Sequence, residues 1–263
     1  MRSLLPVIFT FILVLPEAHA QFEQRAEAVG IDHRFKGSNP IVAGLALFDM
    51  NNDDLLDIFF AGGRENERLY INNGTSFDRI VTWLDVEDFE YYDLNVNSVS
   101  AGDLNNDGLT DLVLCTYDEE SSFILLNKGT DRFDVVMPWI NQVWIPVWTA
   151  GASMGDINRD GMLDIFFHNY IDTARVEVDT VTGLVIHQHV GTRNNLFVNM
   201  GDSVFEDKSL EYGIELSGNT LASTFTDFDD DGDADIYVIN DFGAFTIPNE
   251  LYENQYPDES VSE

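Results

Sequence analysis

Four short acidic segments carry the side chains best suited to chemistry in this sequence. Each places oxygen-bearing residues at the first, third, fifth and ninth positions of a nine-residue stretch, and the stretches begin at Asp49, Asp103, Asp156 and Asp227. Calcium takes six to eight oxygen ligands from carboxylates, amides and main-chain carbonyls. Four such side chains and a carbonyl at position 7 can wrap one calcium ion, so each segment is a candidate calcium loop.

The candidate ligands occupy the same loop positions in all four segments. The predicted side-chain ligands are Asp49, Asn51, Asp53 and Asp57 in the first loop, Asp103, Asn105, Asp107 and Asp111 in the second, Asp156, Asn158, Asp160 and Asp164 in the third, and Asp227, Asp229, Asp231 and Asp235 in the fourth. The predicted main-chain carbonyl ligands are those of Leu55, Leu109, Met162 and Asp233. The predicted cofactor is therefore Ca²⁺, with up to four ions bound.

Position 6 distinguishes the first loop from the other three. It is Gly in the second, third and fourth loops, where glycine permits a sharp backbone turn, but it is Asp54 in the first. Either Asp54 takes a left-handed conformation, which Asp tolerates, or that site binds more weakly; the site at Asp49 is predicted to be the weakest. Magnesium demands tighter octahedral geometry and structural zinc prefers Cys and His ligands, so calcium is favoured over both.

An apolar run with the composition of a β-strand follows each acidic loop. These runs place an apolar residue at loop position 12, where an EF-hand requires a bidentate Glu, so an EF-hand is excluded. Further along, three of the units contain Asn-x-Gly followed by Phe, which is typical of a hairpin turn between strands. Each unit is therefore predicted to be a four-stranded antiparallel meander of about 50 residues, the size of a propeller blade.

The predicted fold class is all-β, with about four blades of the β-propeller type in an incomplete ring. The predicted divisions are a signal peptide at 1–20, an N-terminal outer strand and lead-in at 21–40, repeats at 41–95, 96–148, 149–220 and 221–256, and a polar tail at 257–263. The third repeat is predicted to contain an insertion at 172–193, and the fourth repeat is predicted to be partial.

The N-terminal segment repeats a pattern found in the third unit. Phe22-Glu23 is followed by Gly30-Ile31 at the spacing that separates Phe205-Glu206 from Gly213-Ile214. Residues 22–28 are therefore predicted to form the outer strand of a blade. In a closed four-bladed ring this strand would pair with the strand around Leu251, whereas in an open arc it would lie away from it.

The charge balance limits the classes of partner. The 263 residues include 13 Lys and Arg against 47 Asp and Glu, a formal net charge of −34. Affinity for nucleic acid or for anionic membranes depends on Lys and Arg, so neither is a predicted partner. The hydrophobic content of 44% is ample for a packed core.

The first twenty residues have the features of a secretory signal. Arg2 precedes an apolar run at residues 4–15 that is too short to span a bilayer, and Ala18-His19-Ala20 matches a cleavage site. We therefore expect a mature chain that begins at Gln21 and is secreted, periplasmic or on the cell surface, without membrane insertion. Cys115 is a lone cysteine in an apolar run, so packing and metals rather than disulfides must hold the fold.

These loops resemble those of the FG-GAP/VCBS repeat family, which includes the blades of integrin α-subunit propellers. The resemblance rests on tandem Asp-x-Asx-x-Asp-Gly-x-x-Asp loops followed by strands, and it extends from about Phe22 to Asn254. The fourth copy, with Pro248-Asn-Glu-Leu-Tyr-Glu-Asn254, looks most like the cartilage-acidic-protein branch. The resemblance implies a β-propeller with calcium in its hairpins and an adhesion or interaction role, and such propellers usually have seven blades.

Two classes of function follow. The first is a non-catalytic adhesion or interaction module that binds an extracellular protein or glycan. The second is a propeller lyase or hydrolase, or a carbohydrate-binding module, acting on extracellular polysaccharide. An enzyme requires a cleft with perturbed His, Tyr, Arg or Lys side chains, and no such cluster stands out in the sequence. No catalytic residue is therefore predicted, and the non-catalytic module is favoured.

Overall fold

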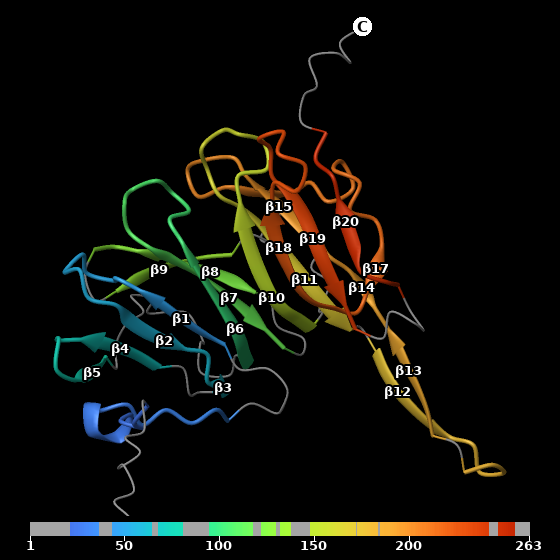
Figure 1. The fold of residues 1–263 in the computed structure, drawn as a ribbon, viewed down its shortest axis with the longest axis horizontal. Helices are drawn as coiled ribbons and strands as arrows, with labels where there is room; N and C mark the ends of the chain where they lie inside the picture. Colours follow the sequence, from blue (N-terminus) through green and yellow to red (C-terminus); the bar gives the residue numbers. More distant parts are fainter. Residues whose placement is uncertain are drawn as a thin grey trace, which may run out of the picture.

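The computed structural model describes residues 22–36, 44–64, 68–80, 95–117, 122–129, 132–137, 148–171, 173–183, 185–241 and 247–255. Within these residues the protein is an all-β arc of blade-like antiparallel sheets that follow one another along the chain (Figure 1). The first and fourth blades lie at opposite ends of the arc and no sheet is closed, which confirms the predicted fold class. No helix in the described part of the chain is long and apolar enough to cross a membrane.

The first two blades are complete four-stranded meanders. Blade 1 has the order β1-β2-β4-β5, with bounds Leu45–Phe48, Asp57–Phe60, Arg68–Asn72 and Phe77–Ile80. Blade 2 contains β6 to β9, with bounds Asn95–Gly102, Asp111–Thr116, Phe123–Asn127 and Phe133–Val136. A short strand β3 (Gly63–Arg64) pairs with β6 and links the two blades.

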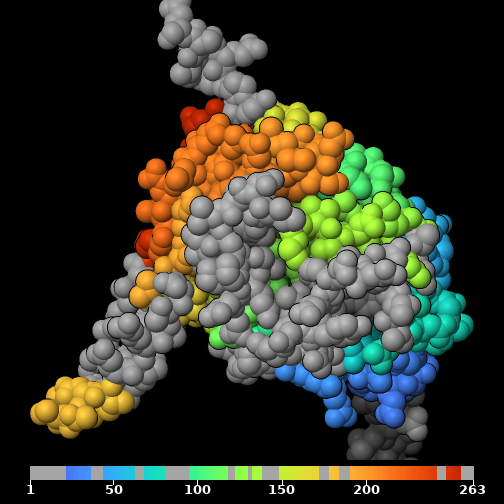
Figure 2. Space-filling view, turned by 180° about the vertical axis from the view of Figure 1, so that it is seen from behind, coloured from blue at the N-terminus to red at the C-terminus, as the bar shows by residue number. Residues whose placement is uncertain are grey.

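The other two blades follow the same plan with one addition and one difference. Blade 3 has the order β10-β11-β15-β16, with bounds Trp148–Gly155, Asp164–Ile171, Asn195–Asn199 and Phe205–Asp207. Blade 4 has three described strands, β18 to β20, with bounds Thr220–Thr226, Asp235–Asn240 and Glu250–Tyr252. Between blade-3 strands, β12 (Thr173–Val178) and β13 (Val185–Val190) form a hairpin whose tip stands away from the body (Figures 1 and 2). Two short strands, β14 (Thr192–Arg193) and β17 (Ser217–Gly218), pair with each other.

The acidic loops are the turns of the first hairpin in each blade. The residue before each loop pairs with the ninth loop residue, as in Phe48 with Asp57 and Gly102 with Asp111. The apolar runs after the loops become second strands, and those of blades 2 and 3 are buried on both faces because a neighbouring blade covers each side. Cys115 is one of these buried residues, and burial raises the pKa of its thiol.

Aromatic residues of the outer strands wedge the blades together. Phe133 of β9 is fully buried in the core between blades 1 and 2, where it meets Phe48 and Met50. Phe205 of β16 lies in the next core with Leu104. A third core joins blades 3 and 4. The hydrophobic core is therefore divided among the interfaces between blades.

The N-terminal segment differs from its prediction as an outer strand. Residues 22–25 belong to no helix or strand, and a 3-10 helix, η1 (Glu27–Val29), follows. Gly30 ends this helix at a left-handed φ of 92°, and the Ile31 N–H closes the turn on the Ala26 carbonyl at 2.9 Å. These local bonds compete with strand pairing, so the prediction of a strand at residues 22–28 is wrong.

The wedge at Phe133 gives the first testable prediction. Phe133→Ala should lower the free energy of unfolding by about 3–5 kcal/mol, because it removes a fully buried aromatic side chain and leaves a cavity. Chemical denaturation measures this. Leu210→Ala is the control, because Leu210 is 65% exposed and its loss should change stability by less than about 0.5 kcal/mol. Equal effects in the two variants would show that Phe133 is not a wedge.

Candidate metal centres

The four acidic loops share one network of hydrogen bonds. In the second loop the first-position carboxylate of Asp103 accepts the N–H of Asp107 at 3.2 Å and that of Gly108 at 2.9 Å. The fifth-position carboxylate of Asp107 then accepts the N–H of Leu109 at 2.9 Å. The same three bonds recur in the first, third and fourth loops. Backbone N–H groups thus hold these carboxylates toward the inside of each turn.

Two left-handed positions shape each loop. Position 6 has positive φ throughout, and Asp54 adopts it at 67° in place of the glycine found elsewhere. Of the two alternatives for Asp54, the left-handed backbone is therefore observed. Position 4 is also left-handed in every loop, at Asn52, Asn106, Arg159 and Asp230, with φ between 57° and 64°. Asn and Asp tolerate this region well, but Arg159 gave no sequence signal for it.

The aspartate at the ninth position of each loop accepts hydrogen bonds from two separate parts of its blade. Asp111 is fully buried; its Oδ2 accepts the Leu104 N–H at 2.8 Å, and its Oδ1 accepts the Asn127 N–H at 2.8 Å. Asp57, Asp164 and Asp235 make the corresponding pairs of bonds. One carboxylate therefore ties the start of its loop to the end of the third strand in the same blade.

Burial also changes the acidity of these carboxyl groups. Desolvation raises the pKa of Asp111 and of Asp164 to about 6, and it raises the pKa of Asp57 as well. The neighbouring loop carboxylates add to the shift by like-charge repulsion. A bound cation would oppose both effects, because it favours the ionised form.

In blades 2, 3 and 4, an asparagine after the third strand links the blade to the one before it. The Asn127 side-chain amide donates to the Met50 carbonyl in loop 1 at 2.9 Å, and Asn199 donates to Leu104 in loop 2 at 2.7 Å. Asn254 repeats the contact with Ile157 in loop 3 at 2.8 Å. From sequence, Asn-x-Gly suggested only a hairpin turn. The recurrence of this Asn after the third strand of every unit was the signal for this second role.

Neighbouring loops also touch through position 4. The Asn106 side-chain amide donates to the Gly161 carbonyl in loop 3 at 2.8 Å. The Arg159 guanidinium lies 3.5 Å from the Asp231 carbonyl oxygen in loop 4, and 3.9 Å from the Asp233 carboxylate. Asp233 is buried with one oxygen unpartnered, and burial raises its pKa. Arg159 thus places a positive charge beside the most acidic of the loops.

The fourth loop has the geometry that best fits a cation. Carboxylate oxygens of Asp227, Asp229 and Asp235 all lie within 4.8 Å of one another. Burial, followed by repulsion from Asp231 and Asp235, raises the pKa of Asp229. In loops 2 and 3 the third residue is Asn, and its amide donates to the fifth-position Asp at 3.1 Å and 2.9 Å. Hard oxygen donors of this kind suit calcium, and the individual ligand assignments remain predictions.

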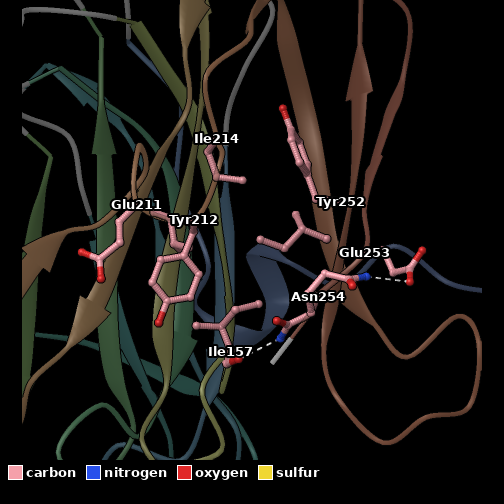
Figure 3. A pocket seen from close by; sticks show the side chains of 10 residues that line it. Ile157, Glu211, Tyr212, Ile214, Tyr252, Glu253 and Asn254 are labelled. Atoms are coloured by element: carbon pink, nitrogen blue, oxygen red, sulfur yellow. Dashed lines mark hydrogen bonds between the residues drawn. The ribbon is translucent and has the colours of Figure 1, made fainter. Parts of the chain in front are cut away.

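A cavity of about 510 Å³ lies between blades 3 and 4 (Figure 3). Its apolar lining residues are Ile157, Leu196, Ile214 and Ile236. Its polar lining residues are Glu211, Tyr212, Tyr252, Glu253, Asn254 and Gln255. The described residues of this lining include no His, Lys or Arg.

A buried histidine lies elsewhere between the same two blades. His168 of β11 places its Nδ1 3.1 Å from the Ser223 hydroxyl, which lies 2.6 Å from the Ser153 hydroxyl. Burial lowers the pKa of His168 to about 4, so its ring is neutral at pH 7. The three residues form a polar contact between β10, β11 and β18.

The family model for the FG-GAP-like repeat matches residues 49–114 and 103–167, each beginning at the first residue of an acidic loop. The chain contains FG-GAP-like repeats. The match spans the first three loops, whereas the fourth loop lies outside the matched residues. The predicted placement in the cartilage-acidic-protein branch stays a prediction.

Two curated relatives are similar in sequence to part of this chain. The T-cell immunomodulatory protein homolog of Plasmodium yoelii yoelii is 26% identical over 132 residues, which is 45% of this chain and 19% of the relative. Its counterpart in Plasmodium falciparum (isolate 3D7) is 30% identical over 129 residues, which is 44% of this chain and 18% of the relative. The matched part is thus under a fifth of each relative's length.

Solved structures show more distant likeness. An Agrocybe aegerita lectin that recognises non-reducing terminal N-acetylglucosamine has a TM-score of 0.36 and 17% identity, over 82% of this chain and 67% of the lectin chain. The Photorhabdus luminescens Tc holotoxin pore has a TM-score of 0.40 and 17% identity, over 74% of this chain and 8% of the toxin chain.

The buried carboxyl groups give the second testable prediction, for the calcium-free protein. The folded-state pKa of Asp111 and Asp164 is about 6 against an ordinary value of 3.8. Their protonated forms therefore stabilise the fold at low pH, and this contribution is lost as the pH rises through about 6. In chelator, unfolding should require more denaturant at about pH 5 than at about pH 7.

Calcium should reduce or reverse that pH dependence, because the metal binds the ionised carboxylates. Asp134→Asn is the control, because Asp134 is half-exposed and lies outside the loops. Its chelated protein should keep the full pH slope. A chelated protein that gains stability between about pH 5 and pH 7 would contradict the prediction.

Proposed function

We propose that this chain is an exported, non-catalytic interaction module whose blades are stabilised by up to four calcium ions. The observation that carries the proposal is the repetition of one loop network four times, at one place in each blade. A chance acidic turn has no reason to recur with the same N–H bonds and the same left-handed positions. Because the same loop network recurs at the same place relative to the core, we favour four sites for the same kind of ion over four turns that are merely solvated.

Electrostatics support the same proposal. The net charge of −34 opposes a compact state through self-repulsion, and the loops concentrate many of these carboxylates on the hairpins. Divalent cations in the loops would offset that repulsion where it is greatest. Each ion would contribute its two positive charges and orient the loop oxygens, and the protein residues described above would hold the turn around it.

An interaction role fits the rest of the molecule better than catalysis does. The described residues that line the cavity at β20 include no basic side chain, and His168 is buried with its ring bonded to a serine. FG-GAP-like repeats and the relatives named as immunomodulatory protein homologs also point to an interaction module. The partner we propose is an extracellular protein or glycan, with no nucleic acid and no membrane insertion.

Calcium-dependent stability is the third testable prediction. An ion that binds only the folded state adds about 2.7 kcal/mol to the free energy of unfolding at a hundredfold excess over its Kd. The thermal midpoint should therefore rise with calcium and fall with chelator. A thermal midpoint that changes neither with calcium nor with chelator would show that the loops are not structural metal sites.

Matched variants assign the effect to particular loops. Asp107→Ala should lower the calcium stoichiometry by one in a titration, because it removes the fifth-position carboxylate of loop 2. Asp53→Ala should have a smaller effect, since loop 1 is the predicted weakest site. Glu215→Ala removes an exposed carboxylate outside the loops and should leave the stoichiometry unchanged.

Export is the fourth testable prediction. When the gene is expressed in a host with a secretory pathway, the chain recovered outside the cytoplasm should begin at Gln21, because cleavage follows Ala20. Mass spectrometry of the intact protein reads this directly. Recovery only of cytoplasmic protein that retains Met1 would contradict the prediction.

A further inference from the structure

One turn of blade 1 carries a motif that the calcium loops do not use. Residues 73–75, between β4 and β5, read Asn-Gly-Thr, which is an acceptor sequence for N-linked glycosylation. No other Asn among the 263 residues of the sequence has Ser or Thr two positions later. Figure 1 shows the β4–β5 hairpin at the outer edge of the arc. The motif therefore marks a single position on the molecule.

The same turn follows the third strand in blades 1, 2 and 3. In blade 1 the side-chain oxygen of Asn72 accepts the Gly74 N–H at 2.9 Å, and Asn127 and Asn199 accept the corresponding glycine N–H groups at 3.0 Å and 3.1 Å. The three glycines are all left-handed, with φ between 67° and 85°. The leading asparagine and the glycine thus define the turn, and the residue between them differs from blade to blade.

The residue between them faces solvent in each of these blades. Asn73 is exposed, the Lys128 side chain is 52% exposed and Met200 is 52% exposed. Asn72 differs, because its amide donates to the Leu56 carbonyl at 3.1 Å and is held against loop 1. Of the two adjacent asparagines, Asn73 is therefore the one that can carry a bulky group without disturbing the blade.

The hydrogen bonds of the Asn73 side chain are compatible with such a group. Its carbonyl oxygen accepts the N–H groups of Thr75 and Ser76 at 3.2 Å and 2.9 Å, and the Thr75 hydroxyl at 3.1 Å. Its amide nitrogen donates to the Ser76 hydroxyl at 3.0 Å and to the Asp78 carboxylate at 3.2 Å. An N-linked sugar replaces only one of the two amide hydrogens. The carbonyl contacts and one donor contact can therefore persist, and the turn keeps its shape.

We propose that Asn73 is the acceptor of an N-linked glycan when the chain passes through a eukaryotic secretory pathway. The host supplies the donor, an oligosaccharide joined through a diphosphate to a lipid. Asn73 Nδ2 forms a bond to the anomeric carbon of the oligosaccharide, the bond from that carbon to the lipid diphosphate breaks, and Nδ2 releases one proton. The inference rests on the export proposed above, because a cytoplasmic chain would not meet this donor.

A glycan at this turn would begin beside loop 1. A Cβ added at Gly74 would lie 3.8 Å from the Leu55 Cδ1, so the turn lies close to the loop. Leu56, the next residue of the loop, is 55% exposed. The oligosaccharide would shield this apolar side chain from solvent and make the surface of blade 1 more soluble.

Expression of the full chain in secreting eukaryotic cells tests the proposal and is the fifth prediction. The secreted protein should lose mass when a peptide-N-glycosidase removes its glycan. When this digestion is done in heavy-oxygen water, peptide mapping should find the isotope label at residue 73, which separates enzymatic release from spontaneous loss of ammonia at an Asn-Gly pair. Thr75→Ala should abolish the glycan, whereas Thr75→Ser should retain it because the motif accepts either hydroxyl.

Two further variants separate the motif from its surroundings. Ser76→Ala is the matched control, because the Ser76 hydroxyl also contacts the Asn73 carbonyl oxygen, at 3.2 Å, but lies outside the motif. This variant should keep its glycan. Lys128→Asn completes the same triplet in blade 2, where Gly129 and Thr130 follow, and the secreted variant should carry two glycans. A gain of modification is a readout that misfolding does not produce.

The outcomes distinguish the glycan from export itself. Secreted protein that carries no glycan at Asn73, or a glycan that survives Thr75→Ala, would overturn the proposal and leave export intact. Retention of the native chain in the cytoplasm with Met1 would overturn export. A second version, with residues 1–20 replaced by the signal of a secreted host protein, then tests the acceptor alone. Modification at Asn73 in that version supports the site, and its absence there overturns it.

Discussion

The structure depends on one buried carboxylate per blade, the aspartate at the ninth position of the acidic loop. In loop 2, Asp111 accepts one N–H from the start of its own loop and one from Asn127 at the end of the third strand. Removing it would leave two buried donors unpaired, which costs more than the bonds themselves contribute. The same residue begins the second strand, so loop shape, strand register and sheet assembly all meet at one side chain.

This arrangement concentrates negative charge in the places where the fold is most constrained. The protein has few basic side chains. In the described part of the chain, Arg159 is the one basic side chain that bridges two of the loops. The backbone N–H groups inside each turn partly compensate the carboxylates, as they do wherever anions lie against successive amides. The remaining charge makes the blades sensitive to pH and to divalent ions, so structure and solution conditions are closely coupled.

The blade architecture could be predicted from the sequence because the repeat is long and regular. Four acidic turns in register with apolar runs were enough to predict antiparallel blades, and a left-handed Asp54 was one of the two alternatives that the loop pattern offered. The N-terminal segment was misjudged because its similarity to residues 205–214 was attributed to the strand, whereas the turn after the strand is what the structure conserves. The interblade role of Asn199 was missed, since a side chain that reaches 95 positions back along the chain leaves no local signal.

The asparagine contact has a consequence for how such arrays change in evolution. Each repeat carries a donor for the loop before it and an acceptor for the repeat after it, as Asn199 and Leu104 show across blades 3 and 2. Donor and acceptor therefore belong to different faces of the same unit. When a whole unit is duplicated or deleted, every remaining pair of neighbouring blades still has its asparagine donor and its carbonyl acceptor. The number of blades can therefore change without any change to the interfaces between them. Partial deletions would break two junctions at once and be removed by selection.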